Sequence, residues 1–134
     1  MIYLASPYTH IDPAVRQRRF ESACRAAAAL ICRGQTVFSP IAHSHVICSF
    51  GVPLDWRFWE RHDRCYLEVC DEMVVLMLDG WRESIGVQAE IAIARELGKP
   101  VSFLAANDEA KEDRNTGRDQ RQSAGLTTRI LQIP

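Results

Sequence analysis

Hydrophobic residues fall in two kinds of segment along the chain, and each kind predicts a different element. Short continuous apolar runs are typical of strands that are covered on both faces. Such runs occupy residues 2–6, 36–39, 72–78 and 101–105. Elsewhere apolar residues recur every three or four positions, which predicts helices. This pattern covers residues 13–33, 54–70 and 84–97, whereas residues 40–53 show neither pattern and are predicted to form an irregular loop.

Residues with strong capping preferences mark the predicted helix ends. Asp12 and Pro13 fit the N-cap and first position of the first helix, and Gly34 fits its C-terminal stop. Asp55 and Ser84 are candidate N-caps of the second and third helices. These signals agree with the hydrophobic pattern, so pattern and caps predict the same three helices.

The predicted order of elements is strand, helix, strand, helix, strand, helix, strand. This alternation favours an α/β fold with a mostly parallel sheet and helices on both faces. We therefore expect a single-domain, three-layer sandwich of flavodoxin or Rossmann type, with four to five strands. Ligands of such sheets bind beyond the carboxyl ends of the strands. The segments that follow those ends are residues 6–8, 40–45 and 79–86.

The chain has 134 residues, which suits one domain. We expect this domain to cover residues 1–106, because the composition then becomes polar and highly charged. Residues 107–134 are predicted to form a flexible tail with a short apolar end, LTTRILQIP. That end is expected either to add an edge strand or to dock on a second subunit.

Charge and hydropathy exclude several partners. The net charge of −1 gives no electrostatic case for binding a nucleic-acid polymer or an anionic membrane. The apolar runs are far shorter than the roughly 20 residues that a membrane span requires. The first residues, MIYLASPYTH, lack the basic region of a signal peptide, so we expect a cytoplasmic location.

Cysteine and histidine give little support for a metal. The five cysteines are an odd number without a CxxC pair, which argues against zinc-finger spacing and a disulfide framework. His43 and His45 have no third ligand nearby, so a loop or pocket-lining role is favoured over a metal site. We predict no metal and no cofactor.

The turn before the third predicted helix has the chemistry of an anion site. Ser84 places a hydroxyl and free backbone N–H groups at the positive end of that helix, and Gly86 lets an anion approach the backbone. Glu90 follows one turn later, roughly 6 Å along the axis, within an otherwise apolar segment. A phosphate on the turn would leave the sugar of a nucleotide near Glu90. Alternatively, Ser84 only caps the helix and Glu90 faces water.

Two further residues are polar where an apolar residue is expected. Asp63 lies on the apolar stripe of the second predicted helix and needs either a partner or a task. The simplest partner is an arginine on the same helix, such as Arg61 or Arg64. Tyr3, in the first strand, is either a core residue or a hydrogen-bond donor to a carboxylate in the cleft.

Together these motifs resemble a known family. The opening IYLASPY, an Asp in a mid-chain helix and the sequence DGWxxSxG followed by Glu90 resemble the nucleoside 2-deoxyribosyltransferase-like superfamily. Within it, the chain looks most like the small DUF1937 group. The spacing of Ser84, Gly86 and Glu90 is also similar to that of nucleoside 5′-monophosphate N-glycosidases. The resemblance covers roughly residues 1–105.

The resemblance implies a role for each matching residue. Glu90 would be the catalytic nucleophile, Asp63 the carboxylate that assists at the departing base or the sugar, and Tyr3 the group that orients the nucleophile. Ser84 and Gly86 would contact a phosphate. A homo-oligomer, dimer or higher, is also implied. The chain departs from the family in its longer turn before Ser84, and no residue here matches the one that some relatives donate from a neighbouring subunit.

The remaining substrate-binding candidates come from the segments that follow the strands. These candidates are Ser6, Tyr8, Trp81 and His43. Aromatic residues that could stack on a base are Tyr8, Phe50, Trp56, Trp59 and Trp81. We expect an enzyme that cleaves the N-glycosidic bond of a nucleotide or nucleoside, by hydrolysis or by transfer to a second base. The alternatives are a non-catalytic nucleotide-binding or signalling module on the same fold, and a phosphoribohydrolase acting on a modified base.

Overall fold

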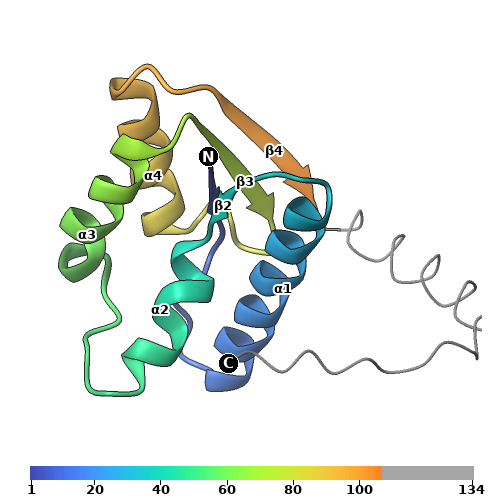
Figure 1. Cartoon of the computed structure of the whole chain (residues 1–134). Coiled ribbons are helices and arrows are strands. Elements are labelled where there is room, and N and C mark those ends of the chain that lie inside the picture. Colours follow the sequence, from blue (N-terminus) through green and yellow to red (C-terminus); the bar gives the residue numbers. More distant parts are fainter. Residues whose placement is uncertain (107–134) are drawn as a thin grey trace, which may run out of the picture.

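Strand pairing in the sheet follows the order β2-β1-β3-β4, and every neighbouring pair is parallel (Figure 1). The computed structural model describes residues 1–106. Its strands are β1 Ile2–Ala5, β2 Val37–Phe38, β3 Glu72–Met77 and β4 Val101–Ala105. Its helices are α1 Pro13–Cys32, α2 Pro40–Cys48, α3 Trp56–Val69 and α4 Ile85–Glu96. This arrangement confirms the predicted α/β sandwich.

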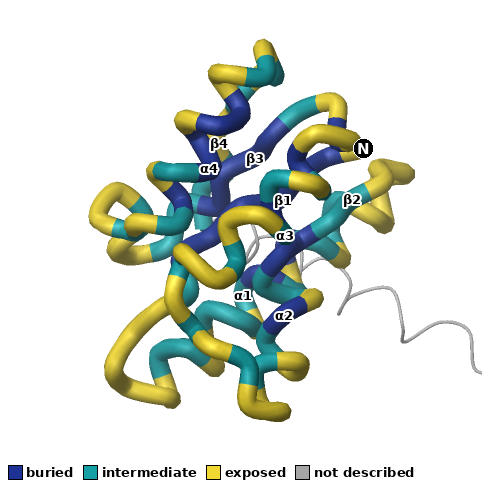
Figure 2. Tube along the Cα trace, turned by 90° about the vertical axis from the view of Figure 1, so that its left-hand side faces the viewer, coloured by how far each residue is buried: buried dark blue, intermediate teal, exposed yellow. Residues whose placement is uncertain are grey.

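Two apolar layers enclose the sheet, one on each face. Tyr3 on β1 packs with residues of α3 and α4, such as Leu67 and Ile91. Leu4, the next residue of β1, packs on the opposite face with Ala26 of α1. Successive side chains of a strand point to opposite faces, so one strand supplies both layers. Figure 2 shows the resulting buried centre along β1 and β3, with exposed segments around it.

The predicted caps are in place. The side chain of Asp12 accepts from the N–H of Ala14, and Pro13 occupies the first turn of α1. Asp55 and Ser84 accept backbone N–H groups at the starts of α3 and α4. Each cap satisfies one of the N–H groups that a helix start leaves unpaired, which stabilises a helix by about 1 kcal/mol.

The loop predicted over residues 40–53 is wrong in its first part, because residues 40–48 form helix α2. Ser39 is its N-cap, accepting from the N–H of Ala42 at 3.2 Å, and Pro40 begins the helix. The segment resembles a loop in sequence because it is rich in Ser and His. Strand β2 is also shorter than predicted, with two residues.

The predicted tail, residues 107–134, lies outside the described residues, so its flexibility stays a prediction. Among residues 1–106, no helix combines the length and the apolar character that crossing a bilayer would require.

Candidate active site

A cavity of about 440 Å³ opens at the carboxyl ends of β1 and β3, a size typical of small-molecule sites. The position agrees with the general rule for parallel sheets. Its walls come from the segments after both strands and from the helices α1 to α4. Among the residues that line it are Ser6, Tyr8, Trp56, Trp59, Asp63, Ser84, Gly86 and Glu90.

Glu90 reaches this cavity from the buried face of α4. It is 5% exposed, and the phenol of Tyr3 on β1 donates a 2.6 Å hydrogen bond to its Oε1. Burial raises the pKa of Glu90 to about 8; the Tyr3 hydrogen bond opposes this shift and the charge of Asp63 adds to it. Burial, followed by the charge of Glu90, holds the pKa of Tyr3 well above its ordinary value, so Tyr3 remains a donor.

Asp63 lines the same cavity from α3 and is 8% exposed. Its partner is not an arginine. Arg64 turns outward to Glu68 and Glu96, while Nδ1 of His62 lies 3.3 Å from Oδ1 of Asp63. Burial raises the pKa of Asp63, and the hydrogen bond and charge of His62 oppose that rise. Two buried carboxyl groups from different helices therefore share one cavity.

The start of α4 offers hydrogen-bond donors to this cavity. The Ser84 hydroxyl accepts from the N–H of Val87 at 3.3 Å, which leaves the N–H groups of Ile85 and Gly86 without a partner in residues 1–106. A Cβ added to Gly86 would lie 3.6 Å from the ring of Trp56. The missing side chain thus keeps open the space between the helix start and Trp56, where an anion can reach the backbone.

The segment after β1 contributes two polar groups. Ser6 is buried, and among the buried side-chain nitrogen and oxygen atoms of the described residues only its Oγ lacks a hydrogen-bond partner. Because an unpaired buried hydroxyl is unfavourable, Ser6 is suited to bind a ligand in the cavity. The phenol oxygen of Tyr8 lies 2.9 Å from Nδ1 of His45 on α2.

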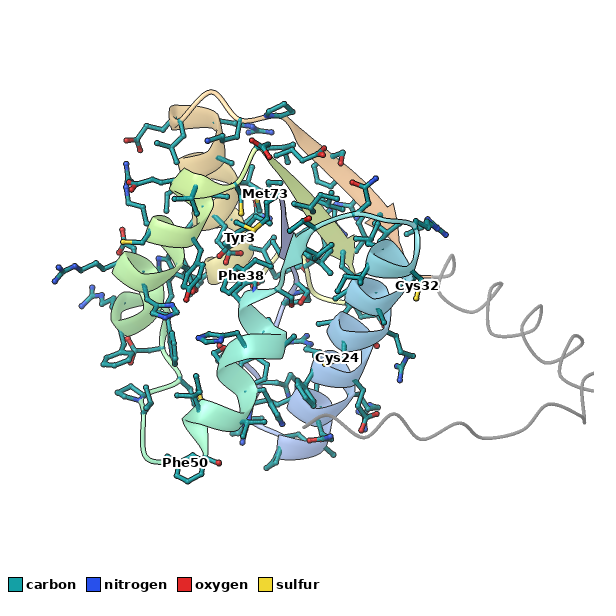
Figure 3. All side chains as sticks on the ribbon, viewed as in Figure 1. Tyr3, Cys24, Cys32, Phe38, Phe50 and Met73 are labelled. Atoms are coloured by element: carbon teal, nitrogen blue, oxygen red, sulfur yellow. The ribbon has the colours of Figure 1, made fainter. Side chains whose placement is uncertain are left out.

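Three candidate residues lie elsewhere. Trp81 packs against Phe103 on β4, with the guanidinium of Arg82 over its ring. His43 is exposed and stacks on His62 at 5.5 Å, outside the cavity. Phe50 is 83% exposed and points away at the tip that follows α2 (Figure 3). The rings in the cavity wall are instead Tyr8, Trp56 and Trp59.

The residues that the structure describes are also the residues that match a known protein family. The DUF1937 family, described as a domain of unknown function, matches residues 1–106. The chain belongs to the DUF1937 family. A comparison with curated proteins finds no match.

In this DUF1937 protein, the cavity wall also includes residues that the sequence did not indicate, and the first of them is Arg19. The guanidinium of Arg19 on α1 donates to the carbonyl oxygens of Thr9 and Asp79 at 2.9 and 3.0 Å. It therefore ties the loop after β1 to the loop after β3. The sequence held no signal for this role, because Arg16 and Arg18 also lie between the apolar residues Val15 and Phe20.

Helix α2 forms another part of the cavity wall that the sequence analysis did not predict. Ile41, Ser44 and Cys48 line the cavity at spacings of three and four, as one face of a helix does. Because this segment was predicted to be a loop, the helical spacing of these three residues was not recognised.

No set of three or more His, Cys, Asp or Glu side chains in the described part of the chain is placed to hold a metal ion. The arrangement instead offers a hydrogen-bonded carboxyl, a second carboxyl, unpaired donors and aromatic rings. Such a set can bind an anionic or hydroxylated ligand and stabilise positive charge that develops beside it.

Proposed function

We propose that this protein cleaves the N-glycosidic bond of a nucleotide or nucleoside, with Glu90 as nucleophile. The observation that carries the proposal is the buried Glu90 carboxyl, hydrogen-bonded by Tyr3 at 2.6 Å and sharing a cavity with Asp63. One carboxylate is enough to bind a sugar hydroxyl group, as in dinucleotide-binding folds, so two buried carboxyl groups favour catalysis over binding alone. Cleavage at C1′ needs both, one for the developing positive charge and one for the departing base.

In the proposed reaction, a carboxylate oxygen of Glu90 forms a bond to C1′ as the bond from C1′ to the base nitrogen breaks. The electron pair leaves with the base, and Asp63 donates its proton to that nitrogen. Water then adds to C1′, gives a proton back to Asp63 and releases Glu90. In transfer, a second base takes the place of water. The resemblance to nucleoside 2-deoxyribosyltransferase-like enzymes and nucleoside 5′-monophosphate N-glycosidases supports this scheme.

The protonation states fit a shared proton. With the pKa of Glu90 at about 8, the pair holds at least one proton at neutral pH. The reactive arrangement has that proton on Asp63 and the charge on Glu90. Positive charge developing at C1′ favours this arrangement, as does the hydrogen bond that Tyr3 donates.

The unpaired N–H groups of Ile85 and Gly86 favour a 5′-monophosphate as substrate, with Arg19 as the cation in the cavity wall. Ser6 supplies a further donor. A phosphate held at the start of α4 places the sugar near Glu90, one turn further along the helix. A homo-oligomer is part of the proposal through the resemblance alone.

The test is a panel of nucleosides and 5′-monophosphates, with ribose and 2′-deoxyribose, in which chromatography separates the free base from the sugar product. The proposal expects base and sugar 5-phosphate in equal amounts from at least one monophosphate. Base without free sugar or sugar 5-phosphate, when a second base is present, indicates transfer. Nucleotide binding without any base release would support the non-catalytic module instead.

A further inference from the structure

A chain of hydrogen bonds runs from the surface of α1 to the cavity. Nε2 of Gln17 donates to Oε1 of Glu21 at 2.9 Å, and Oε1 of Gln17 lies 3.1 Å from Nε2 of His45. Nδ1 of His45 lies 2.9 Å from the phenol oxygen of Tyr8, which lines the cavity. Three bonds thus connect an exposed carboxylate to a cavity wall.

Glu21 fixes the direction of every bond in this chain. An ionised carboxylate only accepts, so the amide of Gln17 turns its NH₂ group to Glu21 and its oxygen to His45. In the neutral form of its imidazole, His45 must then carry its proton on Nε2, which leaves Nδ1 as an acceptor. Nδ1 can therefore only receive the O–H of Tyr8.

The surrounding groups hold this arrangement. The ring of Phe20 stacks on His45 at 4.0 Å with 13° between the planes, so the imidazole is kept in its orientation. Tyr8 meets His45 edge-on at 5.6 Å. Burial raises the pKa of the Tyr8 phenol, and the nearby guanidinium of Arg16 opposes that rise. A guanidinium only donates, so the hydrogen bond between Arg16 and Tyr8 uses the phenol oxygen as acceptor and agrees with the phenol proton pointing to His45.

Since its single proton is committed to His45, Tyr8 presents its oxygen to the cavity as an acceptor. The wall of the same cavity also includes the apolar residues Ile41, Leu54 and Trp59. The proposed scheme puts the phosphate at the start of α4 and C1′ at Glu90, so we assign the part of the wall that includes Tyr8 to the base.

We propose that Tyr8 is a specificity-determining residue that accepts a hydrogen bond from the base, so that bases with an exocyclic amino group are preferred over their oxo counterparts. This inference rests on the proposed function, because it assigns that part of the cavity to a base. An amino group donates to Tyr8, whereas an oxo group sets two acceptors against each other and leaves both unpaired.

The experiment compares matched pairs of 5′-monophosphates, adenosine with inosine and cytidine with uridine, by kcat/KM for base release. The wild type is expected to favour the amino member by about 10-fold or more. Tyr8→Phe removes the acceptor and should bring this ratio close to one, whatever its effect on the absolute rate. Tyr66→Phe, which removes a phenol outside the cavity wall, is the matched control and should leave the ratio unchanged.

Glu21→Gln tests the chain without altering the cavity. The amide introduced by this substitution can donate as well as accept, so the amide of Gln17 can turn over, His45 can change tautomer and the Tyr8 proton can point into the cavity. The amino-to-oxo ratio should therefore fall at least about twofold. A loss of folding or rate alone would affect both members of a pair equally.

The outcomes separate this inference from the proposed function. Equal use of amino and oxo substrates by the wild type, or an unchanged ratio in Tyr8→Phe, overturns the role of Tyr8 and leaves bond cleavage standing. If the nucleotides bind but are not cleaved, the ratio of Kd for the oxo and amino members of each pair replaces the ratio of kcat/KM and tests the role of Tyr8 in the same way. The same pairs are also run with 2′-deoxyribose. If none of these nucleotides is cleaved or bound, the role of Tyr8 is overturned, whereas bond cleavage itself is decided by the full panel of nucleosides and nucleotides.

Discussion

The phenol of Tyr3 on β1 donates a 2.6 Å hydrogen bond to Oε1 of Glu90 on α4, across 87 positions of sequence. Figure 3 shows Tyr3 in the layer between the sheet and the helices α3 and α4. The bond gives a buried carboxylate one donor and fixes which way it faces. It is the contact through which the fold itself positions the proposed nucleophile.

Removing this donor should affect the reaction more than the fold. Tyr3→Phe is expected to lower kcat for base release by about 10- to 100-fold, because the Glu90 carboxylate loses a charge-assisted hydrogen bond. The pKa of Glu90 should also rise, since the Tyr3 bond lowers it. Both effects are measured in pH–rate profiles. Wild-type kcat in Tyr3→Phe would show that the bond is structural only.

The two carboxyl groups predict a bell-shaped pH dependence. The reactive pair holds one proton, so kcat/KM should fall above about pH 8, the pKa of Glu90, and fall again at acid pH as the pair takes up a second proton. Asp63→Asn removes the acid, and its residual rate should instead keep rising with pH until Glu90 is ionised. A wild-type rate that increases steadily beyond pH 9 would contradict the shared proton.

The raised pKa of Glu90 also predicts how stability depends on pH. Between its unfolded value of 4.5 and its folded value of about 8, the folded chain holds a proton that the unfolded chain has released. This group therefore makes the wild type less stable as pH rises through that window, with no further loss above it. Glu90→Gln does not titrate, so its advantage in unfolding free energy should grow by at least about 1 kcal/mol from pH 5 to pH 8.

Urea unfolding at pH 5, 6.5 and 8 measures this difference. Glu60→Gln, at an exposed position of α3, is the matched control, and its difference from the wild type should stay constant. A constant difference for Glu90→Gln as well would mean that Glu90 is not a protonated, desolvated group in the folded protein.

Gly86 should matter for phosphate and not for folding. Its backbone is not in the left-handed region, and an added Cβ would make an ordinary contact with Trp56 at 3.6 Å. Gly86→Ala is thus expected to leave the unfolding free energy unchanged or raise it by up to about 1 kcal/mol. The KM of a 5′-monophosphate should rise several-fold, while that of the nucleoside stays the same. An equal change in the two KM values would contradict phosphate binding at this turn.

The sequence predicted the elements whose signals are local, and missed what depends on orientation. Caps at Asp12 and Ser84 identified helix starts because capping involves only neighbouring residues. Helix α2 was hidden by its Ser- and His-rich composition, and with it the difference between His43 and His45. Residues two positions apart on a helix point about 200° away from each other. His43 therefore stacks on His62, whereas His45 meets Tyr8.

Contacts between distant segments could be proposed but not measured from the sequence. Burial of Glu90 was one of two alternatives that the sequence left open, and the structure shows that both Glu90 and Asp63 are buried. That His62 rather than an arginine meets Asp63 depends on how α3 packs, and the arginine side chains are long enough to reach outward. The bond of Arg19 to Asp79 joins segments 60 positions apart, for which spacing gives no signal.

The most direct test of the central claim is the rate of base release by Glu90→Gln at a substrate concentration that saturates both variants. Gln retains the shape of Glu90 and lacks the charge that C1′ requires, so kcat should fall about 1,000-fold or more while the nucleotide still binds. Glu60→Gln should match the wild type. Base release by Glu90→Gln at the wild-type rate would contradict the assignment of Glu90 as nucleophile.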